Sequence, residues 1–396
     1  MTSRAPVKDW ASDFDHTDAR WMNDPFPIWD ELRKGCPVAH SERFEGGAYF
    51  PSRYQDVRDI AYDSEHFSSR RVVVRDKKIS PVFPSPPITS DPPEHRPDRM
   101  PLLPPFNPKA VEKLQPRTRA LCERLIDRFI DAGRCDAATD YAQHIPTRVI
   151  AHMLGVPEED GDLFRRWIKL ALEEGIRDNS KSMQAIMEMS AYFKDQIARR
   201  GTQRGEDLIS YLLDLRHDGK PIPEDKLLGT LRLLLIAGID TTWSAIGSSL
   251  WHLATHDEDR RRLVADPSLM DTAVEEFLRA YAPVTMAREV VKEVTIGGCP
   301  MKPGSMVLLS FPAANRDPQT FPDADRVLID RKENRHAAFG LGIHRCIGSN
   351  LARMEMRVAI EEWLKRIPEF RLEDPALVRW SEGTVRGPRS MPMAFG

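Results

Sequence analysis

The stretch AAFGLGIHRCIGSNLARMEMRV, residues 337–358, places one cysteine in a turn rich in glycine and cations, directly before an amphipathic helical segment. Backbone N–H groups of such a turn, and the positive end of the next helix, stabilise the thiolate that a ligand cysteine must form. Glycine also leaves room for a large planar cofactor against the backbone. The residues that surround Cys346 are Gly340, Gly342, His344, Arg345 and Gly348. A lone cysteine at a helix start is more often a small buried apolar residue, so the rest of the chain must decide between the two interpretations.

The bulk composition is that of a globular protein. The chain has 396 residues, 41% hydrophobic and 30% charged, which is enough for a large core. It has no repeat, Gly/Ser linker or long charge run, so we expect one domain over residues 1–396. Because 57 Lys and Arg face 60 Asp and Glu, the net charge of −3 gives no attraction to nucleic acid or anionic membranes.

The cysteine pattern argues against a disulfide framework and against a zinc cluster. There are five cysteines, they form no CxxC pair, and their number is odd. This usage fits a reducing compartment. The first twenty residues lack the apolar core that a signal peptide or membrane anchor needs, so we expect a cytoplasmic protein.

Hydrophobic periodicity divides the chain into a mixed start, a helical half and a strand-containing end. Residues 25–35 and 54–63 read as helices and residues 46–53 as a strand, which predicts a small mixed layer. The proline-rich run 81–108 predicts a long ordered loop. From 109 to 256 amphipathic helices dominate, and residues 288–298 and 304–311 alternate as strands around a Gly/Pro turn.

The segment 223–256 differs from the other helices because its apolar residues extend all round the helix. Such a helix belongs in a core or in a membrane. The polar or charged residues that interrupt the run include Arg232, Asp240, Thr241, Thr242 and His252. We therefore expect a buried central helix rather than a membrane span.

The decapeptide FGLGIHRCIG, residues 339–348, resembles the haem-binding loop of the cytochrome P-450 family, the haem-thiolate monooxygenases. The match consists of Phe339, Gly340, Gly342, His344, Cys346 and Gly348 in that order. The likeness extends over essentially the whole chain. It implies a mainly α protein with small β-sheets, one large domain, and a long central helix over the haem. It also implies haem b (iron protoporphyrin IX) as cofactor, with Cys346 as ligand of its iron.

On the central helix, AGIDTT at residues 237–242 resembles the family's acid and alcohol pair. The resemblance implies that Ala237 leaves room for dioxygen, that Asp240 relays protons from solvent, and that Thr241 handles a proton through its hydroxyl. The simpler alternative for Thr241 is a polar kink bonded to its own helix. Asp240 makes that alternative weaker, because a buried charge is costly without a task or a partner.

Two further groups of residues match the family's pattern. Glu276 and Arg279 match its Glu-x-x-Arg pair, which the resemblance treats as scaffold joined by a later arginine, expected to be Arg326. The residues expected at the haem propionates are His95, Arg99, Arg288 and His344. Pro97 and Pro101 interrupt the segment that carries His95 and Arg99, and this can distort their common orientation.

Substrate walls are expected from several mostly apolar stretches. These are the loop between Arg70 and Ser90, the helices around 165–200, and individual positions at Leu233, Ile236, Val284, Met286, Thr384 and Val385. They indicate a hydrophobic small molecule, although each position is equally compatible with ordinary core. Arg70 and Arg71 either capture a carboxylate or simply face solvent.

The resemblance implies insertion of one oxygen atom of dioxygen into such a molecule, by hydroxylation, epoxidation or dealkylation. Electrons would come from NAD(P)H through a separate ferredoxin and an NAD(P)H-dependent ferredoxin reductase. A basic patch for that partner is expected at Arg345, Arg353, Arg357, Lys109 and Lys113, unless these are merely solvated charges. The competing hypotheses are a cysteine-dependent or zinc hydrolase that uses Cys346 with His344, and a haem carrier or sensor without turnover.

Overall fold

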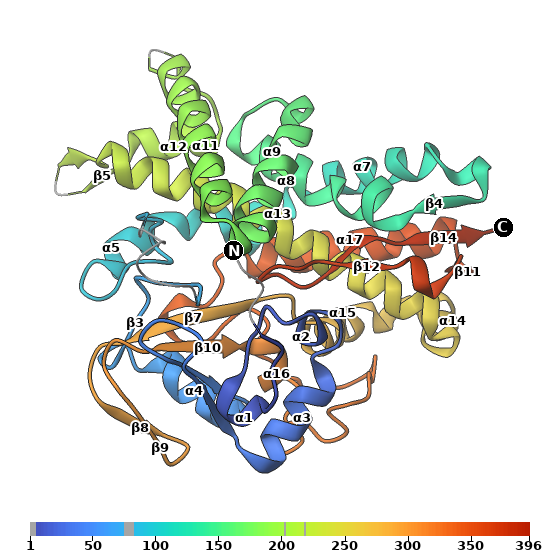
Figure 1. Ribbon diagram of the computed structural model, residues 1–396. Coiled ribbons are helices and arrows are strands. Elements are labelled where there is room, and N and C mark those ends of the chain that lie inside the picture. The colour runs from blue at the N-terminus through green and yellow to red at the C-terminus, as the bar shows by residue number, and fades with distance from the viewer. Residues whose placement is uncertain (1–4, 75–82, 202, 218) are drawn as a thin grey trace.

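The computed structural model describes residues 5–74, 83–201, 203–217 and 219–396, and it is mainly helical with small sheets (Figure 1). The predicted fold class is therefore confirmed. The larger helices are α3 (Phe26–Gly35), α4 (Tyr54–Tyr62), α7 (Gln115–Asp127), α8 (His144–Leu154), α9 (Gly161–Lys169), α11 (Asn179–Arg199), α12 (Leu208–Asp214), α13 (Glu224–Thr255), α14 (Asp257–Ala265), α15 (Met270–Ala280) and α17 (Ser349–Arg366).

A five-stranded sheet forms the mixed layer that the first hundred residues predict. Its order is β1 (Val38–Ser41), β2 (Ala48–Pro51), β10 (Met306–Ser310), β7 (Thr285–Val290) and β3 (Phe67–Ser68). Only β2 and β10 pair in parallel. Two of the strands come from a part of the chain that lies more than two hundred residues later, a partnership that local patterns do not reveal.

The alternation of residues 288–298 predicts one strand, but the structure divides this segment between two strands. Strand β7 ends at Val290, and β8 (Val294–Ile296) turns back onto β9 (Cys299–Met301) as a separate hairpin. Its two turn residues, Gly297 and Gly298, have φ of 57° and 81°. A two-residue hairpin with positive φ at both positions favours glycine, which explains the sharp reversal.

The expected long loop at 81–108 is partly helical, so this prediction is wrong in its second half. Residues 81 and 82 lie outside the described residues. Beyond them, the chain forms α5 (His95–Arg99), the 3-10 turns η2 (Met100–Leu102) and η3 (Pro104–Phe106), and then α6 (Pro108–Glu112). Several prolines stand in the first turn of these short pieces, where a missing N–H costs no hydrogen bond.

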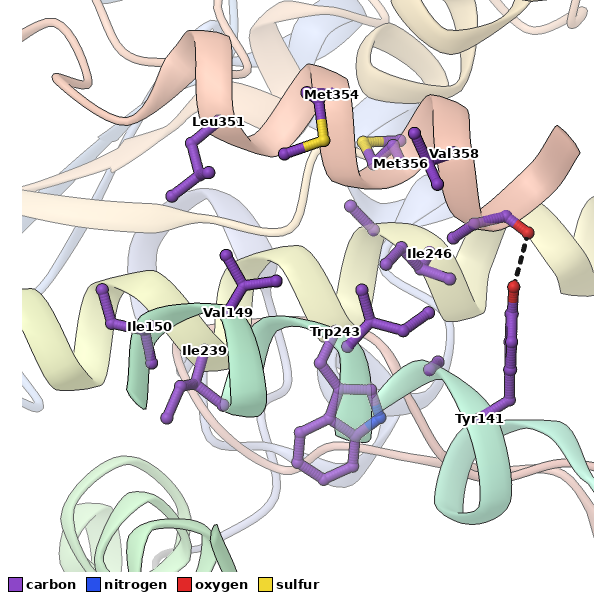
Figure 2. Packing of buried hydrophobic residues seen from close by; sticks show 14 of the residues in the cluster. Tyr141, Val149, Ile150, Ile239, Trp243, Ile246, Leu351, Met354, Met356 and Val358 are labelled. Carbon is purple, nitrogen blue, oxygen red and sulfur yellow. Dashed lines mark hydrogen bonds between the residues drawn. The ribbon is translucent and has the colours of Figure 1, made fainter. Parts of the chain in front are cut away.

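The central helix α13 is 32 residues long and lies in the core between α8 and α17 (Figures 1 and 2). Figure 2 shows Trp243 and Ile246 of α13 among side chains of α8 and α17, including Val149 and Met356. By length and composition the helix could cross a membrane, but 72% of its most apolar window is buried inside the protein. The burial supports the expected core helix.

The C-terminal tail returns to this central helix. Strand β13 (Pro388–Ser390) pairs with β12 (Arg379–Trp380), and the approach to α13 is so close that a Cβ on Gly387 would lie 2.3 Å from the Cβ of Ser244. Glycine is therefore required at position 387. The result is that a residue of the tail, Arg389, reaches the middle of α13.

Below the cysteine loop, Glu276 and Arg279 form a fully buried ion pair on α15. Arg279 uses all its donors, on both Glu276 oxygens and on three backbone carbonyls of residues Asn315, Ala324 and Arg326. The same carboxylate accepts from the Arg331 Nε at 2.9 Å. Complete pairing offsets the desolvation that a buried charge otherwise costs.

The third member of this cluster is Arg331, and the expected Arg326 is wrong in that role. Arg326 contributes only its backbone carbonyl, and its side chain is exposed. Arg331 is 7% exposed in its side chain and lies beside Glu276. Successive turns at Asp323–Arg326 and Leu328–Arg331 direct the later arginine inward, and sequence spacing alone does not fix such turns.

The cluster predicts that substitutions of Arg331 and Arg326, five positions apart in the sequence, affect stability differently. Arg331→Gln should lower the free energy of unfolding by about 1–3 kcal/mol, because it removes a charged hydrogen bond from a buried carboxylate. Arg326→Gln keeps the backbone carbonyl and should stay within about 0.5 kcal/mol of wild type. Denaturant unfolding followed by circular dichroism measures both variants. Equal losses, or a larger loss in Arg326→Gln, would contradict this account.

Candidate functional site

A cavity of about 490 Å³ lies between α13, the cysteine loop, strand β7 and the tail. Its lining is mostly apolar and contains, among the described residues, five arginines and no aspartate or glutamate. All six positions expected to contact substrate line it: Leu233, Ile236, Val284, Met286, Thr384 and Val385. The bridge between Val284 and Val385 brings the tail to this wall. Part of the predicted loop 70–90 also lines the cavity, and residues 75–82 lie outside the described residues.

The cysteine loop holds the Cys346 sulfur at the cavity wall. The Cys346 N–H donates to the Phe339 carbonyl at 2.7 Å, which closes the loop. Gly340 and Gly342 have φ of 69° and 67°, and a Cβ on Gly342 would lie 2.1 Å from the Ala61 carbonyl oxygen of α4. The loop therefore needs glycine at Gly342 both for its backbone angle and for its packing on α4.

Cys346 is accessible only because it faces the cavity. Burial within the protein raises the pKa of its thiol, whereas the Gly348 N–H and the cations Arg99 and Arg345 favour the thiolate. Helix α17 begins three residues later, with its positive end toward the loop. A metal cation bound in the cavity would stabilise the Cys346 thiolate directly, in addition to the N–H group and the two arginines.

Cations and imidazoles gather at one side of the cavity. The residues that line this wall are Arg99, Arg288 and His344. Burial lowers the pKa of Arg288 to about 10 and that of His344 to about 3, with Arg288 adding to the effect at His344. The Nε2 of His344 is buried and has no partner among the described residues. Such a cluster has the composition of a site for anionic groups.

His95 occupies a different place from the other three expected residues. It is 6% exposed and lies behind His344, with 4.5 Å between the ring centroids, and it is not part of the cavity wall. Arg99 is at the wall, and its Nη2 donates to the Arg345 carbonyl at 2.5 Å. Both residues lie on the short helix α5, which continues through Pro97, so the expected interruption does not occur there; even so, only Arg99 reaches the cavity wall.

The side chains of Thr241 and Asp240, the alcohol and the acid predicted on α13, point in different directions. Ala237 and Thr241 line the cavity, and the Thr241 hydroxyl donates to the Ala237 carbonyl at 2.8 Å, within the helix. Asp240 is fully buried and points elsewhere: its Oδ1 lies 2.7 Å from Arg389 Nη2. This contact is an ion pair inside the protein.

Arg389 connects Asp240 to the outside. Its Nε donates to Glu173 at 2.5 Å and its Nη1 to Ser244 at 3.0 Å. Glu173 and Arg389 also line a second, polar cleft together with Lys169 and Lys181. Burial raises the pKa of Asp240 from 3.8 to about 6, while Arg389 opposes the rise. Asp240 therefore ends a chain of ionisable groups that begins at the polar cleft.

The elevated pKa predicts a pH-dependent stability. The native carboxyl keeps its proton up to about pH 6, whereas the unfolded chain releases it near 3.8, so this stabilising term is full at low pH and is lost as pH rises through 6. Relative to Asp240→Asn, wild type should lose roughly 1–2 kcal/mol between pH 5 and pH 8. Denaturant unfolding at both pH values measures this; a constant difference, or an opposite trend, would contradict the assignment.

Sequence reasoning missed three of these residues. Arg389 and Glu173 lie 149 and 67 positions from Asp240, and no local pattern links them to it. Arg331 was missed because the segment 312–340, which leads into the cysteine loop, holds four arginines. The sequence indicates that Asp240 needs a partner, because a buried acid is costly without one. It does not indicate which residue that partner is.

The expected basic patch is only partly free. Arg353 pairs with Glu275 at 2.5 Å and lies over the Phe339 ring, and Arg357 donates to the Gln115 side chain. The other three members, Arg345, Lys109 and Lys113, are exposed.

Comparison with known proteins gives a consistent result. A family model described as cytochrome P-450 matches residues 147–378. The chain is 36% identical to a mycinamicin IV hydroxylase/epoxidase of Micromonospora griseorubida, with 93% of this chain and 94% of that protein covered. It is 35% identical to a vitamin D(3) 25-hydroxylase of Pseudonocardia autotrophica, with 95% and 94% covered.

Solved structures agree. The fold matches the PksS cytochrome of the Bacillus subtilis 168 bacillaene polyketide synthase with a TM-score of 0.89 and 29% identity, over 97% of this chain and all of that one. It matches a Bacillus megaterium structure in complex with testosterone with a TM-score of 0.87 and 30% identity, over 94% and 98%.

Proposed function

The chain belongs to the cytochrome P-450 family and is a monooxygenase, and from this premise we propose that it inserts one oxygen atom of dioxygen into a hydrophobic small molecule by hydroxylation, epoxidation or dealkylation. The observation that carries the proposal is the cavity itself. One wall presents the Cys346 sulfur, another presents Thr241, and the rest of the lining is mostly apolar, with arginines and His344 at separate places. A cysteine hydrolase does not need this arrangement, and a haem carrier does not need the Asp240 chain.

The residues of the cavity fit haem b. A thiol on a glycine-lined wall suits an iron ligand, and the partnerless His344 Nε2 beside Arg288 and Arg99 suits two carboxylates at the cofactor's edge. In this assignment Cys346 holds the iron, while Arg99, Arg288 and His344 hold the propionates and His95 supports His344 from behind. When bound, the haem supplies the activation of dioxygen and the transfer of one oxygen atom to the substrate.

The protein's own residues then orient the substrate, exclude water and move protons. The apolar lining around Leu233, Ile236 and Val284 dehydrates the substrate and keeps it against the cofactor. Ala237 leaves room beside the cofactor, and the Thr241 hydroxyl holds a proton there, exchanging its bond to the Ala237 carbonyl for one toward the cavity.

Protons reach this point from the polar cleft. Glu173 and Arg389 stand between the cleft and Asp240, whose pKa of about 6 lets its carboxyl both take and release a proton near neutral pH. Asp240 faces away from the cavity, so its proton must pass along α13 to Thr241 through a rotation of the side chain or through water. The burial and raised pKa of Asp240 support its proposed relay role, and Glu173 is a second acid on the route; Arg389 stays protonated and holds the two carboxylates in place.

Electrons are proposed to come from NAD(P)H through a ferredoxin reductase and a ferredoxin in the cytoplasm. The exposed cations on the Cys346 side, Arg345, Lys109 and Lys113, provide the local positive charge that an acidic partner would recognise. Arg353 and Arg357 contribute less, because each already holds a partner within the protein.

The decisive experiment follows isotopic oxygen. The purified holoenzyme is given a ferredoxin, its reductase, NADPH and ¹⁸O-labelled dioxygen, with a compound selected from an apolar library by its optical shift. The product should carry one labelled atom per molecule. NADPH use that does not respond to the compound, with no labelled product, would contradict the monooxygenase proposal and favour a haem carrier or sensor.

The same assay tests Thr241. In Thr241→Ala, NADPH use should continue, but product per NADPH should fall by at least about tenfold while hydrogen peroxide rises, because the proton is no longer held at the cavity. Thr242→Ala is the matched control one residue further along α13, and it should retain coupling. Tight coupling in Thr241→Ala would refute the proposed role of the hydroxyl.

A further inference from the structure

The charges that line the large cavity are all of one sign. Five arginines line it, with no aspartate or glutamate among the described lining residues. Arg99 and Arg288 stand beside Cys346 and His344, where the proposed haem would use them. The remaining three, Arg70, Arg71 and Arg232, lie on other elements and have no role in the function proposed above.

Arg232 is the most unusual of the three, because it is only 8% exposed. It lies on α13, in a helix whose neighbouring positions Leu231 and Leu235 are fully buried. Burial lowers the pKa of its guanidinium, and no charged group of the described residues offsets this. A buried cation without an anionic partner is costly, so the position requires an explanation.

The contacts of Arg232 are with neutral acceptors. Its Nη1 donates to the Ser190 hydroxyl at 2.9 Å and its Nη2 to the Pro84 carbonyl at 3.3 Å. A guanidinium has five N–H groups, so three remain without an acceptor in the described part of the chain. These two bonds tie α13 to α11 and to the segment after residue 82, and they hold the guanidinium in place at the cavity wall.

The other two arginines are poorer anchors for a ligand. Arg70 is exposed to solvent, which screens its charge, and Arg71 lies 3.9 Å from the Glu289 carboxylate. Both border the same cavity and add positive potential to it. Arg70 and Arg71 therefore attract an anion into the cavity. The anion can then bind at Arg232, whose guanidinium is held in place and has N–H groups without an acceptor in the described part of the chain.

We propose that the substrate is an apolar acid whose carboxylate pairs with Arg232 while its hydrocarbon part extends to Thr241. This rests on the proposed monooxygenase function and specifies its substrate class. A guanidinium with free N–H groups binds a carboxylate through two parallel hydrogen bonds, and the low-polarity surroundings strengthen the pair. The bound carboxylate supplies the anion that Arg232 lacks in the protein.

The helix sets the length of this acid. Arg232 and Thr241 are nine residues apart on α13, which places them about 13 Å apart along the axis and about half a turn apart around it, although both line the same cavity. Carbon–carbon bonds of about 1.5 Å at near-tetrahedral angles span that distance with about ten to twelve atoms. The carbon that is oxidised therefore lies near the end of the molecule remote from the carboxylate.

The test compares acids with their uncharged esters. Decanoate, dodecanoate and tetradecanoate, and the methyl ester of each, are titrated into the wild-type holoenzyme, and binding is followed by the optical shift and by calorimetry. At least one acid should bind at least about tenfold more tightly than its ester, because only the acid forms the ion pair. No preference for any acid over its ester would overturn the proposal.

Variants of Arg232 test whether this residue causes the preference for the acid over its ester. Arg232→Gln should remove the preference for the acid while the Kd of the ester changes by less than about threefold, and Arg232→Lys should keep part of it. Arg261→Gln, at an exposed arginine of α14 outside both the cavity and the polar cleft, is the control and should bind like wild type. Persistence of the preference in Arg232→Gln, or equal loss of acid and ester binding, would overturn the proposal.

Failure of this inference is separable from failure of the proposed function. If labelled oxygen enters a neutral compound and no acid is preferred, the monooxygenase stands and the assignment of Arg232 falls. If calorimetry shows the acid preference but no labelled oxygen enters any product, the carboxylate site stands and the proposed reaction falls.

Discussion

The placement of one sulfur atom constrains much of this molecule. The Cys346 loop is held by its bond to the Phe339 carbonyl, by the contact of Gly342 with α4, and by the start of α17. Beneath it, the buried Glu276, Arg279 and Arg331 cluster fixes the chain that leads into the loop. Together these contacts determine where the Cys346 sulfur, the proposed iron ligand, stands relative to α13.

Charge is separated across the central helix. On the cavity side all the described charged residues are arginines, whereas the acid of α13 is turned away and balanced by Arg389. This separation allows two tasks that would interfere in one space. An anionic group can be held in the cavity without repulsion from an acid, while in the proposed function protons come from Glu173 and Asp240 on the other side.

Patterns that depend on neighbouring residues were predictable from the sequence. The glycines and cysteine of the loop, the all-round apolar character of α13 and the Glu276–Arg279 spacing each express a local requirement, and each lies where expected. Interactions between distant segments were not predictable. The tail residue Arg389 meets Asp240 only because Gly387 lets β13 approach α13. Arg331 takes the place of Arg326 because of the turns at Asp323–Arg326 and Leu328–Arg331. The proline-rich segment forms short helices because its prolines fall in first turns, a matter of position rather than of composition.

The measurement that bears most directly on this account is the spectrum of the ferrous carbon monoxide complex. The wild-type protein, purified from cells supplied with haem, should give the strongly red-shifted Soret band of thiolate ligation, and so should Cys299→Ser, which removes a different half-buried cysteine. Cys346→Ser should lose that band while its circular dichroism stays native. A wild-type protein that folds without binding haem, or a Cys346→Ser variant that keeps the band, would contradict the central claim.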